Sequence, residues 1–520
     1  MNSTKLKLRE TGRFSTLFLD YAEGNPGLKD FYGLKPDLLN FKDQIAKKKI
    51  NSNDRKTLTD SLLQQYRSID ISPAVEKNIT GLLDDNTFTV TTGHQLNIFS
   101  GPLYFHYKII TTINLAKKLK NLYPDYNFVP VYWMASEDHD YKEISHFNLF
   151  GKQYTWETDQ QGAVGRFDPK SIKTLIDKLP ENPDLFIQAY LGHDTLADAT
   201  RYYVNKLYGS QGLVVLDADY PALKERFKNI MKDDLLYHNA GDLAKTTTDK
   251  LVRLGYKPQA FPRDINLFYL DNNLRERIVK EDGKYIVKNT SISFTEDEIL
   301  SLLDKHPEKF SPNVILRPVC QEQILPNLAY IGGPAEVSYW LQLKPVFEHY
   351  KIAFPILVPR NFAMILNKTL IKRIKKLGVK PEELFLNKKS LKNIYLKQHG
   401  SGSLEILNEK QMIIHAFGEI KIKAGIIDQS LEGFAGAEMS KVLKSLDNIE
   451  KRMQKTEEKK QETGMIQLEQ LEERLFPDGN LQERTDNFLS FWLNDLSFLS
   501  KLQQALEPLD SHFYILFDDE

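Results

Sequence analysis

Four consecutive ionisable residues, preceded by a serine, stand at the end of an apolar run in the sequence. Ser136-Glu137-Asp138-His139-Asp140 directly follows the apolar run 128–135, FVPVYWMA. Charged groups at the end of a buried strand are costly unless they have a task there. Carboxylates beside an imidazole can act as general acids and bases, or can bind an ammonium group. We therefore take 136–140 as the first candidate site, with Glu137, Asp138 and His139 as its catalytic groups.

Two other interpretations of this acidic segment stay open. The first is a metal site, because His146 lies seven residues after His139. The segment lacks a compact His-x-x-x-His or two-His–carboxylate spacing, so we expect no metal cluster. The second is a solvated acidic turn without a function.

A second candidate is the polar loop Thr92-Gly93-His94-Gln95. It follows the β-branched run 87–91 and precedes a helix that we expect to begin at 100–102, with Pro102 in its first turn. A strand, a polar loop and a helix N-terminus can bind a phosphate or another anion. The same four residues also suit an ordinary structural turn. In the binding interpretation, Lys108 on the helix is a phosphate contact.

A third candidate repeats this organisation. Gly332-Gly333-Pro334 follows the apolar run 328–331 and precedes a helix expected over 335–350, with Glu336 in its first turn. Arg360 follows the next apolar run, 354–358. Backbone N–H groups of the glycine loop can face an anion. This strand–loop–helix segment should therefore match, in geometry, the segment that contains Thr92-Gly93-His94-Gln95.

These units predict an α/β fold with a doubly wound, Rossmann-like parallel sheet. Carboxyl ends of parallel strands meet at one edge of a sheet, so we expect the loops near 94, 138, 333 and 360 to converge on one cleft. The expected core spans 1–368. It contains two inserted segments, a helical one at about 151–208 and one at about 255–310 with an antiparallel β-meander.

The remainder of the chain has a different pattern. From 369 to 500 the composition shifts to Lys, Glu, Leu and Gln, and residues 439–456 carry an apolar seam with heptad spacing. This predicts an α-helical coiled-coil domain, in which the run 404–431 supplies an antiparallel partner helix. The apolar segment 501–520 is expected to pack back on the body.

Composition narrows the class of protein. The chain has 520 residues, 41% of them hydrophobic, and a formal net charge of −1, which gives no support for nucleic-acid binding. Its single cysteine, Cys320, lies among apolar residues and is expected to be buried and unreactive. One thiol cannot form an internal disulfide, and no apolar run is long enough to span a bilayer. We therefore expect a cytoplasmic protein without membrane partners.

Several long motifs occur together and in order. With them in view, the chain resembles the bacillithiol-biosynthesis cysteine-adding enzymes, the BshC family, over essentially its whole length. The matching stretches are TTGHQLNIFSGPLYFHYKI at 91–109, VPVYWMASEDHDYKEI at 129–144, LRPVCQEQILPNLAYIGGPAEVSYWLQLKPVF at 316–347, ILVPRNFAMI at 356–365 and FPDGNLQERTDNF at 476–488.

The resemblance implies a core similar to those of class I aminoacyl-tRNA synthetases and a coiled coil that forms a homodimer. It implies a ligase that joins cysteine, through an amide, to the amine of glucosaminyl malate in the last step of bacillithiol biosynthesis. Many relatives have Gln where this chain has His94, so the resemblance implies a hydrogen-bonding role there. By position, the nucleotide-binding loop of the synthetases corresponds to Gly93, His94 and Gln95. Their acidic motif corresponds to Glu137, Asp138 and His139. Later motifs correspond to Gly332, Gly333, Glu336 and Arg360.

Amide formation from a free carboxylate requires activation, and a phosphate-type site beside an acidic cluster suits adenylation of cysteine by ATP. Two rival hypotheses are a non-catalytic, nucleotide-binding dimeric scaffold and a metal-dependent amidohydrolase. In the ligase hypothesis, Gly93, His94, Gln95, Lys108, Gly332 and Gly333 bind the nucleotide. Glu137 and Asp138 bind an ammonium group, His139 is the base for the attacking amine, and Arg360 holds the malate carboxylates, with Ser136, Asp140 and Glu336 as further substrate contacts.

Overall fold

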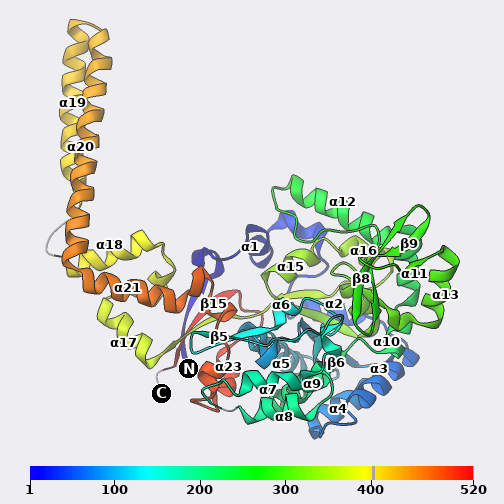
Figure 1. Ribbon diagram of the computed structural model, residues 1–520. Coiled ribbons are helices and arrows are strands. Elements are labelled where there is room, and N and C mark those ends of the chain that lie inside the picture. The colour runs from blue at the N-terminus through cyan, green and yellow to red at the C-terminus, as the bar shows by residue number, and fades with distance from the viewer. Residues whose placement is uncertain (182, 401–404, 519–520) are drawn as a thin grey trace. The chain divides into compact units, whose positions relative to one another are not determined.

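A computed structural model describes residues 1–181, 183–400 and 405–518. The chain forms two compact units (Figure 1). One comprises residues 1–364 and 481–516, and the other comprises residues 365–480 with the end of the chain from Phe517. Within the described residues, no helix is both long and apolar enough to cross a membrane.

A five-stranded parallel sheet forms the centre of the first unit, in the order β13-β12-β2-β3-β6. Its strands are β2 (Thr87–His94), β3 (Asn127–Met134), β6 (Val214–Asp217), β12 (Asn327–Gly332) and β13 (Ile356–Pro359). The chain winds outward from β2 in one direction through β3 and β6, then in the other through β12 and β13. This confirms the doubly wound, Rossmann-like α/β fold, and its topological switch point lies between β2 and β12.

Strand β2 is buried along its entire length, and its polar residues are paired inside the sheet. The side-chain oxygen of Asn327 accepts hydrogen bonds from the hydroxyls of Thr89 (3.1 Å) and Thr91 (2.8 Å). Phe88 and Val90, which alternate with these threonines, point into the apolar core on the opposite face. The alternation explains how a threonine-rich strand occupies the middle of a sheet.

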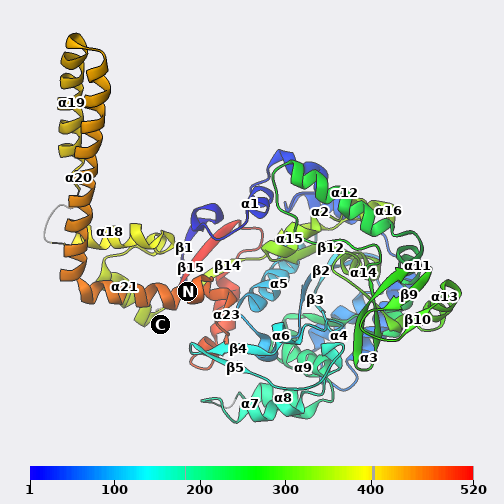
Figure 2. The same cartoon turned by 45° about the horizontal axis from the view of Figure 1, so that its top comes forward.

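Helix α5 (Tyr104–Leu122) packs on β2 and β3, and Figure 2 shows it along one face of these strands. The helix begins two residues later than expected, because a 3-10 turn (Ile98–Ser100) with Phe99 at φ 51° precedes it. The Leu103 N–H at its start donates to the Asp486 carbonyl at 2.9 Å. This amide of the expected anion site is therefore already paired within the protein.

The helix expected over 335–350 is two helices, α15 (Pro334–Trp340) and α16 (Lys344–His349). Pro345 lacks an N–H and restricts the residue before it, so the first helix cannot continue through it. The other helices of the region before β7 are α1 (Thr16–Ala22), α2 (Asn40–Lys47), α3 (Ser52–Gln65), α4 (Pro73–Gly81), α6 (Tyr141–Ile144), α7 (Lys173–Ile176), α8 (Asp184–Gly192), α9 (Leu196–Tyr208), α10 (Pro221–Glu225), α11 (Lys228–Tyr237) and α12 (Asn239–Arg253).

The region expected to be helical, about 151–208, contains α7, α8 and α9, but it begins inside a β-hairpin of β4 (His146–Leu149) and β5 (Lys152–Thr155). The later inserted segment forms an antiparallel sheet in the order β10-β9-β8-β7-β11. Its elements are β7 (Leu267–Asp271), β8 (Leu274–Glu281), β9 (Lys284–Val287), β10 (Ser293–Phe294), α13 (Glu296–Lys305) and β11 (Phe310–Pro312), followed by α14 (Arg317–Ile324).

The second unit contains a helical hairpin, which confirms the coiled-coil region of the fold. Helices α19 (Leu407–Ile427) and α20 (Ser430–Lys460) lie side by side (Figure 1) and run antiparallel, as the ion pairs of Lys410 with Asp447 and Glu450 require. Leu404, where the partner helix was expected to start, lies outside the described residues. The remaining elements of the chain are β1 (Asn2–Lys7), β14 (Phe362–Asn367), α17 (Lys368–Leu377), α18 (Lys388–His399), α21 (Glu462–Leu475), α22 (Leu489–Trp492), α23 (Phe498–Ala505) and β15 (His512–Asp518), which lies next to β1.

Candidate functional site

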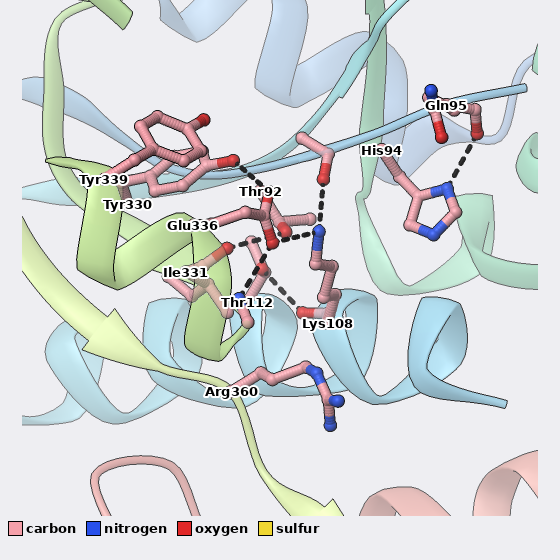
Figure 3. Close-up of polar contacts among 12 residues, drawn as sticks. Thr92, His94, Gln95, Lys108, Thr112, Tyr330, Ile331, Glu336, Tyr339 and Arg360 are labelled. Atoms are coloured by element: carbon pink, nitrogen blue, oxygen red, sulfur yellow. Dashed lines mark hydrogen bonds and ion pairs between the residues drawn. The ribbon is translucent and has the colours of Figure 1, made fainter. Parts of the chain in front are cut away.

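A buried ion pair lies at the topological switch point of the sheet (Figure 3). The ammonium of Lys108, from α5, is 2.5 Å from Glu336 Oε2 and donates to the Gly93 carbonyl at 2.7 Å. Glu336 also accepts from the Tyr330 hydroxyl at 2.7 Å and from the Gly333 N–H at 2.8 Å. The loops after β2 and β12 are therefore joined through Lys108 and Glu336.

Burial shapes the electrostatics of this pair, because the side chains of Lys108 and Glu336 are only 4% and 23% exposed. Burial raises the pKa of Glu336, but the charge and hydrogen bond of Lys108 outweigh it and leave that pKa below its ordinary value. Burial lowers the pKa of Lys108 in spite of Glu336. Among the described residues, Gly93 and Glu336 engage two of the three N–H donors of the ammonium.

Gly93 and Gly333, which contact the Lys108–Glu336 pair, are closely surrounded by other atoms. A Cβ atom at Gly93 would lie 3.1 Å from the Tyr330 hydroxyl, and one at Gly333 would lie 3.3 Å from Glu336 Oε2. The position of a Cβ at Gly93 is also 3.6 Å from a guanidinium nitrogen of Arg317, whose other nitrogen donates to the Tyr339 hydroxyl at 3.1 Å. Glycine thus leaves room for backbone and cationic groups to approach one another.

Arg360 reaches this group from the end of β13, but its guanidinium is largely engaged. It donates to Glu483 at 2.6 Å and to the Asn361 carbonyl at 2.8 Å, and only 1% of the residue is exposed. Its Nε, which has no hydrogen-bond partner among the described residues, lies 3.7 Å from the position of a Cβ on Gly333. The expected role of Arg360 in holding the malate carboxylates stays a prediction, and Glu483 already engages one of its guanidinium nitrogens.

His94 is a neutral imidazole beside the switch point. Burial, and next the charge of Lys108, lower its pKa to about 3. Its Nδ1 lies 2.7 Å from the Gln95 carbonyl. A carbonyl can only accept, so Nδ1 carries the proton and Nε2 offers a lone pair. This arrangement suits the hydrogen-bonding role expected of His94.

Gln95 connects this loop with the loop after β3. Its amide nitrogen donates to Asp138 at 2.8 Å and to Glu143 at 2.9 Å. Burial raises the pKa of Asp138, but contacts with His139, the charge of Arg275 and the Gln95 hydrogen bond outweigh it and hold that pKa well below its usual range. Asp138 is therefore an ionised, partly exposed carboxylate.

Glu137 is occupied by a protein cation. Its carboxylate is 2.5 Å from the ammonium of Lys224, which also pairs with Asp219 at 2.9 Å. Asp219 in turn binds Arg166 at 2.7 Å. The expected contact of Glu137 with a substrate ammonium stays a prediction; in this structure Lys224 supplies the ammonium that the carboxylate binds.

The two residues that flank the acidic triplet also have structural partners. The buried Ser136 hydroxyl donates to Asp217, at the end of β6. The exposed Asp140 caps α6, because its carboxylate accepts from the Glu143 N–H at 3.3 Å. Neither geometry supports the expected substrate contacts at Ser136 and Asp140.

His139 has an open face. Its side chain is 47% exposed, and its Nδ1 is 2.8 Å from a guanidinium nitrogen of Arg275 on β8. The four loops thus lie along one rim of the sheet. The Arg360 N–H donates to the Gly332 carbonyl, Glu336 and Lys108 join Gly333 to Gly93, and Gln95 binds Asp138.

Sequence reasoning did not identify four cations of this rim, namely Arg275, Lys224, Arg317 and Arg484. The last two lie in motifs that it noticed, LRPVCQEQ and FPDGNLQERTDNF, but it gave them no role. Arg484 is exposed, and its guanidinium carbon lies 5.6 Å from the centre of the Tyr104 ring, which the Arg360 guanidinium carbon approaches to 5.2 Å. The part of the chain that the structure describes holds no group of three His, Cys, Asp or Glu side chains suited to a metal ion.

Comparisons with known proteins identify the family of this chain. Residues 1–361 match the profile "Bacillithiol biosynthesis BshC, N-terminal Rossmann-like domain", and residues 363–517 match the profile of the C-terminal coiled-coil domain of the same family. Relatives named "Putative cysteine ligase BshC" are 45% identical in Flavobacterium psychrophilum (98% of each chain covered) and 42% identical in Flavobacterium johnsoniae (98% of this chain and 99% of the relative). A relative of the same name in Cytophaga hutchinsonii is 40% identical over 97% of both chains. The sheet, the helical hairpin and these matches over nearly the whole length show that the chain belongs to the BshC family of bacillithiol biosynthesis.

Proposed function

We propose that this protein is a ligase that joins the carboxyl group of cysteine to the amine of glucosaminyl malate, in the last step of bacillithiol biosynthesis. The observation that carries the proposal is the arrangement of the rim. Cations at the switch point, Lys108 and Arg317, lie one loop away from the ionised and partly exposed carboxylate of Asp138. A phosphate-binding side beside an ammonium-binding side is what activation of an amino acid requires.

The activating nucleotide in this proposal is ATP. The cysteine carboxylate oxygen attacks the α-phosphorus, which forms cysteinyl adenylate and releases pyrophosphate. The amine of glucosaminyl malate then attacks the carbonyl carbon, the amine loses a proton, and AMP leaves with the former carboxylate oxygen.

The residues present fit a nucleotide at the switch point. Gly93, with Gly332 and Gly333, leaves space for the backbone to approach a phosphate, and Lys108 and Arg317 supply the positive charge. The Leu103 amide at the start of α5 is paired with Asp486, so we assign phosphate binding to the side chains. His94, whose Nε2 carries a lone pair, and Gln95 complete the nucleotide side.

On the substrate side, Asp138 is the proposed anion for the cysteine ammonium. Arg484 replaces Arg360 as the proposed ligand of the malate carboxylates, because its guanidinium is exposed whereas that of Arg360 is bound to Glu483. His139, with half of its side chain open, is the proposed catalytic residue of the amide-forming step.

We also propose that the protein is a cytoplasmic homodimer formed through α19 and α20. Their hairpin leaves large apolar side chains exposed, which a second copy would cover. These include Met412, Ile420, Ile422, Ile426 and Phe434, with exposed fractions from 50% to 81%. Sedimentation should show a dimer, and substituting Ile422 and Ile426 by Glu should yield monomers with an unchanged circular dichroism spectrum. A monomeric native protein would contradict this part of the proposal.

The activity is tested with purified protein, cysteine, glucosaminyl malate and ATP, followed by mass spectrometry of the thiol product. Failure to form product both in the purified mixture and after addition of lysate from a deletion strain would refute the ligase assignment. The scaffold alternative is tested with His139→Ala in that strain. A scaffold variant would still restore bacillithiol, whereas we expect the enzyme variant not to restore it.

A further inference from the structure

Arg275, on β8, is held in one orientation by two other strands of the inserted meander. Its guanidinium carbon lies 3.9 Å from the centre of the Phe268 ring on β7. Its Nε donates to the Ser311 hydroxyl at 3.2 Å and one Nη to the Pro312 carbonyl at 3.4 Å, both on β11. The remaining Nη points to His139, whose Nδ1 is 2.8 Å away. The meander thus presents one fixed N–H donor to the loop after β3.

This contact determines which nitrogen of neutral His139 carries the proton. A guanidinium stays protonated in proteins and has no acceptor, so Nδ1 of His139 must accept from Arg275. Asp138 Oδ1 lies farther from Nδ1, at 3.5 Å, and accepts the backbone N–H of His139 at 2.7 Å. The neutral ring therefore has its proton on Nε2, the opposite tautomer to that of His94.

We propose that Arg275 is a positioning residue that fixes His139 as an Nε2–H donor, so that His139 stabilises an oxyanion and does not act as the base for the amine. The inference rests on the proposed ligase reaction. When the amine attacks the cysteinyl carbonyl, negative charge develops on the carbonyl oxygen, and a preorganised donor stabilises it. The proton of the amine passes to water as the tetrahedral species collapses and AMP leaves.

The tautomer can be measured without any activity, by ¹⁵N spectra of the full-length protein labelled at its 11 histidines. The His139 signals are identified by their loss in His139→Gln. We expect an unprotonated Nδ1 and a protonated Nε2 when the ring is neutral, and a mixture of tautomers in Arg275→Met. A protonated Nδ1 in the wild-type protein would overturn the proposal, and so would an unchanged tautomer in a folded Arg275→Met variant.

If Arg275→Met does not fold, Ser311→Ala removes only the Nε anchor and serves as the second variant. The spacing of the amide oxygen and nitrogen of Gln resembles that of the two ring nitrogens of His. Gln at 139 can therefore accept from Arg275 and still donate. In the donor role His139→Gln should retain at least about 10-fold more kcat than His139→Ala, whose loss should be about 100-fold, as expected for removal of one oxyanion donor.

Equal loss of kcat in His139→Gln and His139→Ala would overturn the donor role. His146→Gln is the matched control at the start of β4, because the hydrogen bond of the His146 ring within the described part of the chain is with the Lys142 carbonyl, at 3.2 Å. The activity of this variant should be unchanged. A wild-type protein without ligase activity would refute the proposed function, whereas the ¹⁵N spectra would still decide whether Arg275 fixes the tautomer.

Discussion

Replacing Lys108 by Met removes the cation of the switch-point pair and leaves the carboxylate of Glu336 without its partner. Breaking a buried pair in this way costs about 3–5 kcal/mol. The Glu336 side chain is 23% exposed, so water recovers part of that loss, and we expect about 2–3 kcal/mol. The unit containing the pair has about 400 residues, so its unfolding entropy is roughly 0.8 kcal/mol/K and its Tm should fall by about 3 °C.

The destabilisation caused by Lys108→Met should depend on pH in a definite direction. Lys108 holds the pKa of Glu336 below its unfolded value, so the contribution of Glu336 to stability is present above the ordinary carboxyl range and is lost as the pH falls. In Lys108→Met the buried carboxylate is penalised at neutral pH and relieved when it is protonated. The difference in Tm between wild-type and variant protein should therefore be greatest near pH 7 and should narrow toward acidic pH.

Calorimetry on the full-length protein measures the effect, with each transition followed separately because the chain has two units. Lys118→Met is the control on the same helix, since its pair with Glu507 is exposed (41% and 60%) and should contribute less than about 1 kcal/mol. Lys108→Met/Glu336→Gln should be less destabilised than the sum of the single variants. A loss below about 1 kcal/mol in Lys108→Met, or a loss that grows in acid, would refute the reasoning.

Three further predictions concern single side chains. Burial raises the pKa of the Cys320 thiol well above its ordinary value, so a thiol reagent should label it only in urea, and rapid labelling of native protein would contradict this. The pKa of His94, lowered to about 3, predicts ¹⁵N signals that stay constant from pH 8 to pH 5; a titration in that range would exclude its burial as a neutral ring. Arg484→Gln should raise KM for glucosaminyl malate about 10-fold or more at unchanged Tm, whereas Arg360→Gln should mainly lower Tm; the reverse pattern would return the carboxylate contact to Arg360.

The sheet could be predicted from the sequence because its signals are local. The β-branched run of β2, the apolar run of β3 and the glycine loop after β12 each predict a strand and its end. Parallel order then brings the loops to one rim without further information. The helical hairpin of α19 and α20 could also be predicted from local patterns, because heptad spacing is a property of one continuous segment.

The partners of the acidic segment could not be predicted, because they come from distant segments. Lys224, which neutralises Glu137, lies 87 residues further along the chain, and Arg275 is brought to His139 by a hydrogen bond spanning 136 residues. No periodicity relates a cation on β8 to an imidazole after β3. The engagement of Arg360 by Glu483, 123 residues away, has the same origin. In each case the charged residue is visible in the sequence, but its partner is brought to it only by the tertiary fold.

Transfer of oxygen from cysteine to AMP tests the central claim, activation of the cysteine carboxylate at this rim, most directly. Cysteine labelled with ¹⁸O in its carboxyl group is incubated with the purified protein, ATP and glucosaminyl malate, and the AMP is examined by mass spectrometry. We expect AMP carrying one ¹⁸O for each thiol product, with both lost in Lys108→Met under conditions where that variant stays folded. Thiol product formed with unlabelled AMP, or with no AMP, would contradict it.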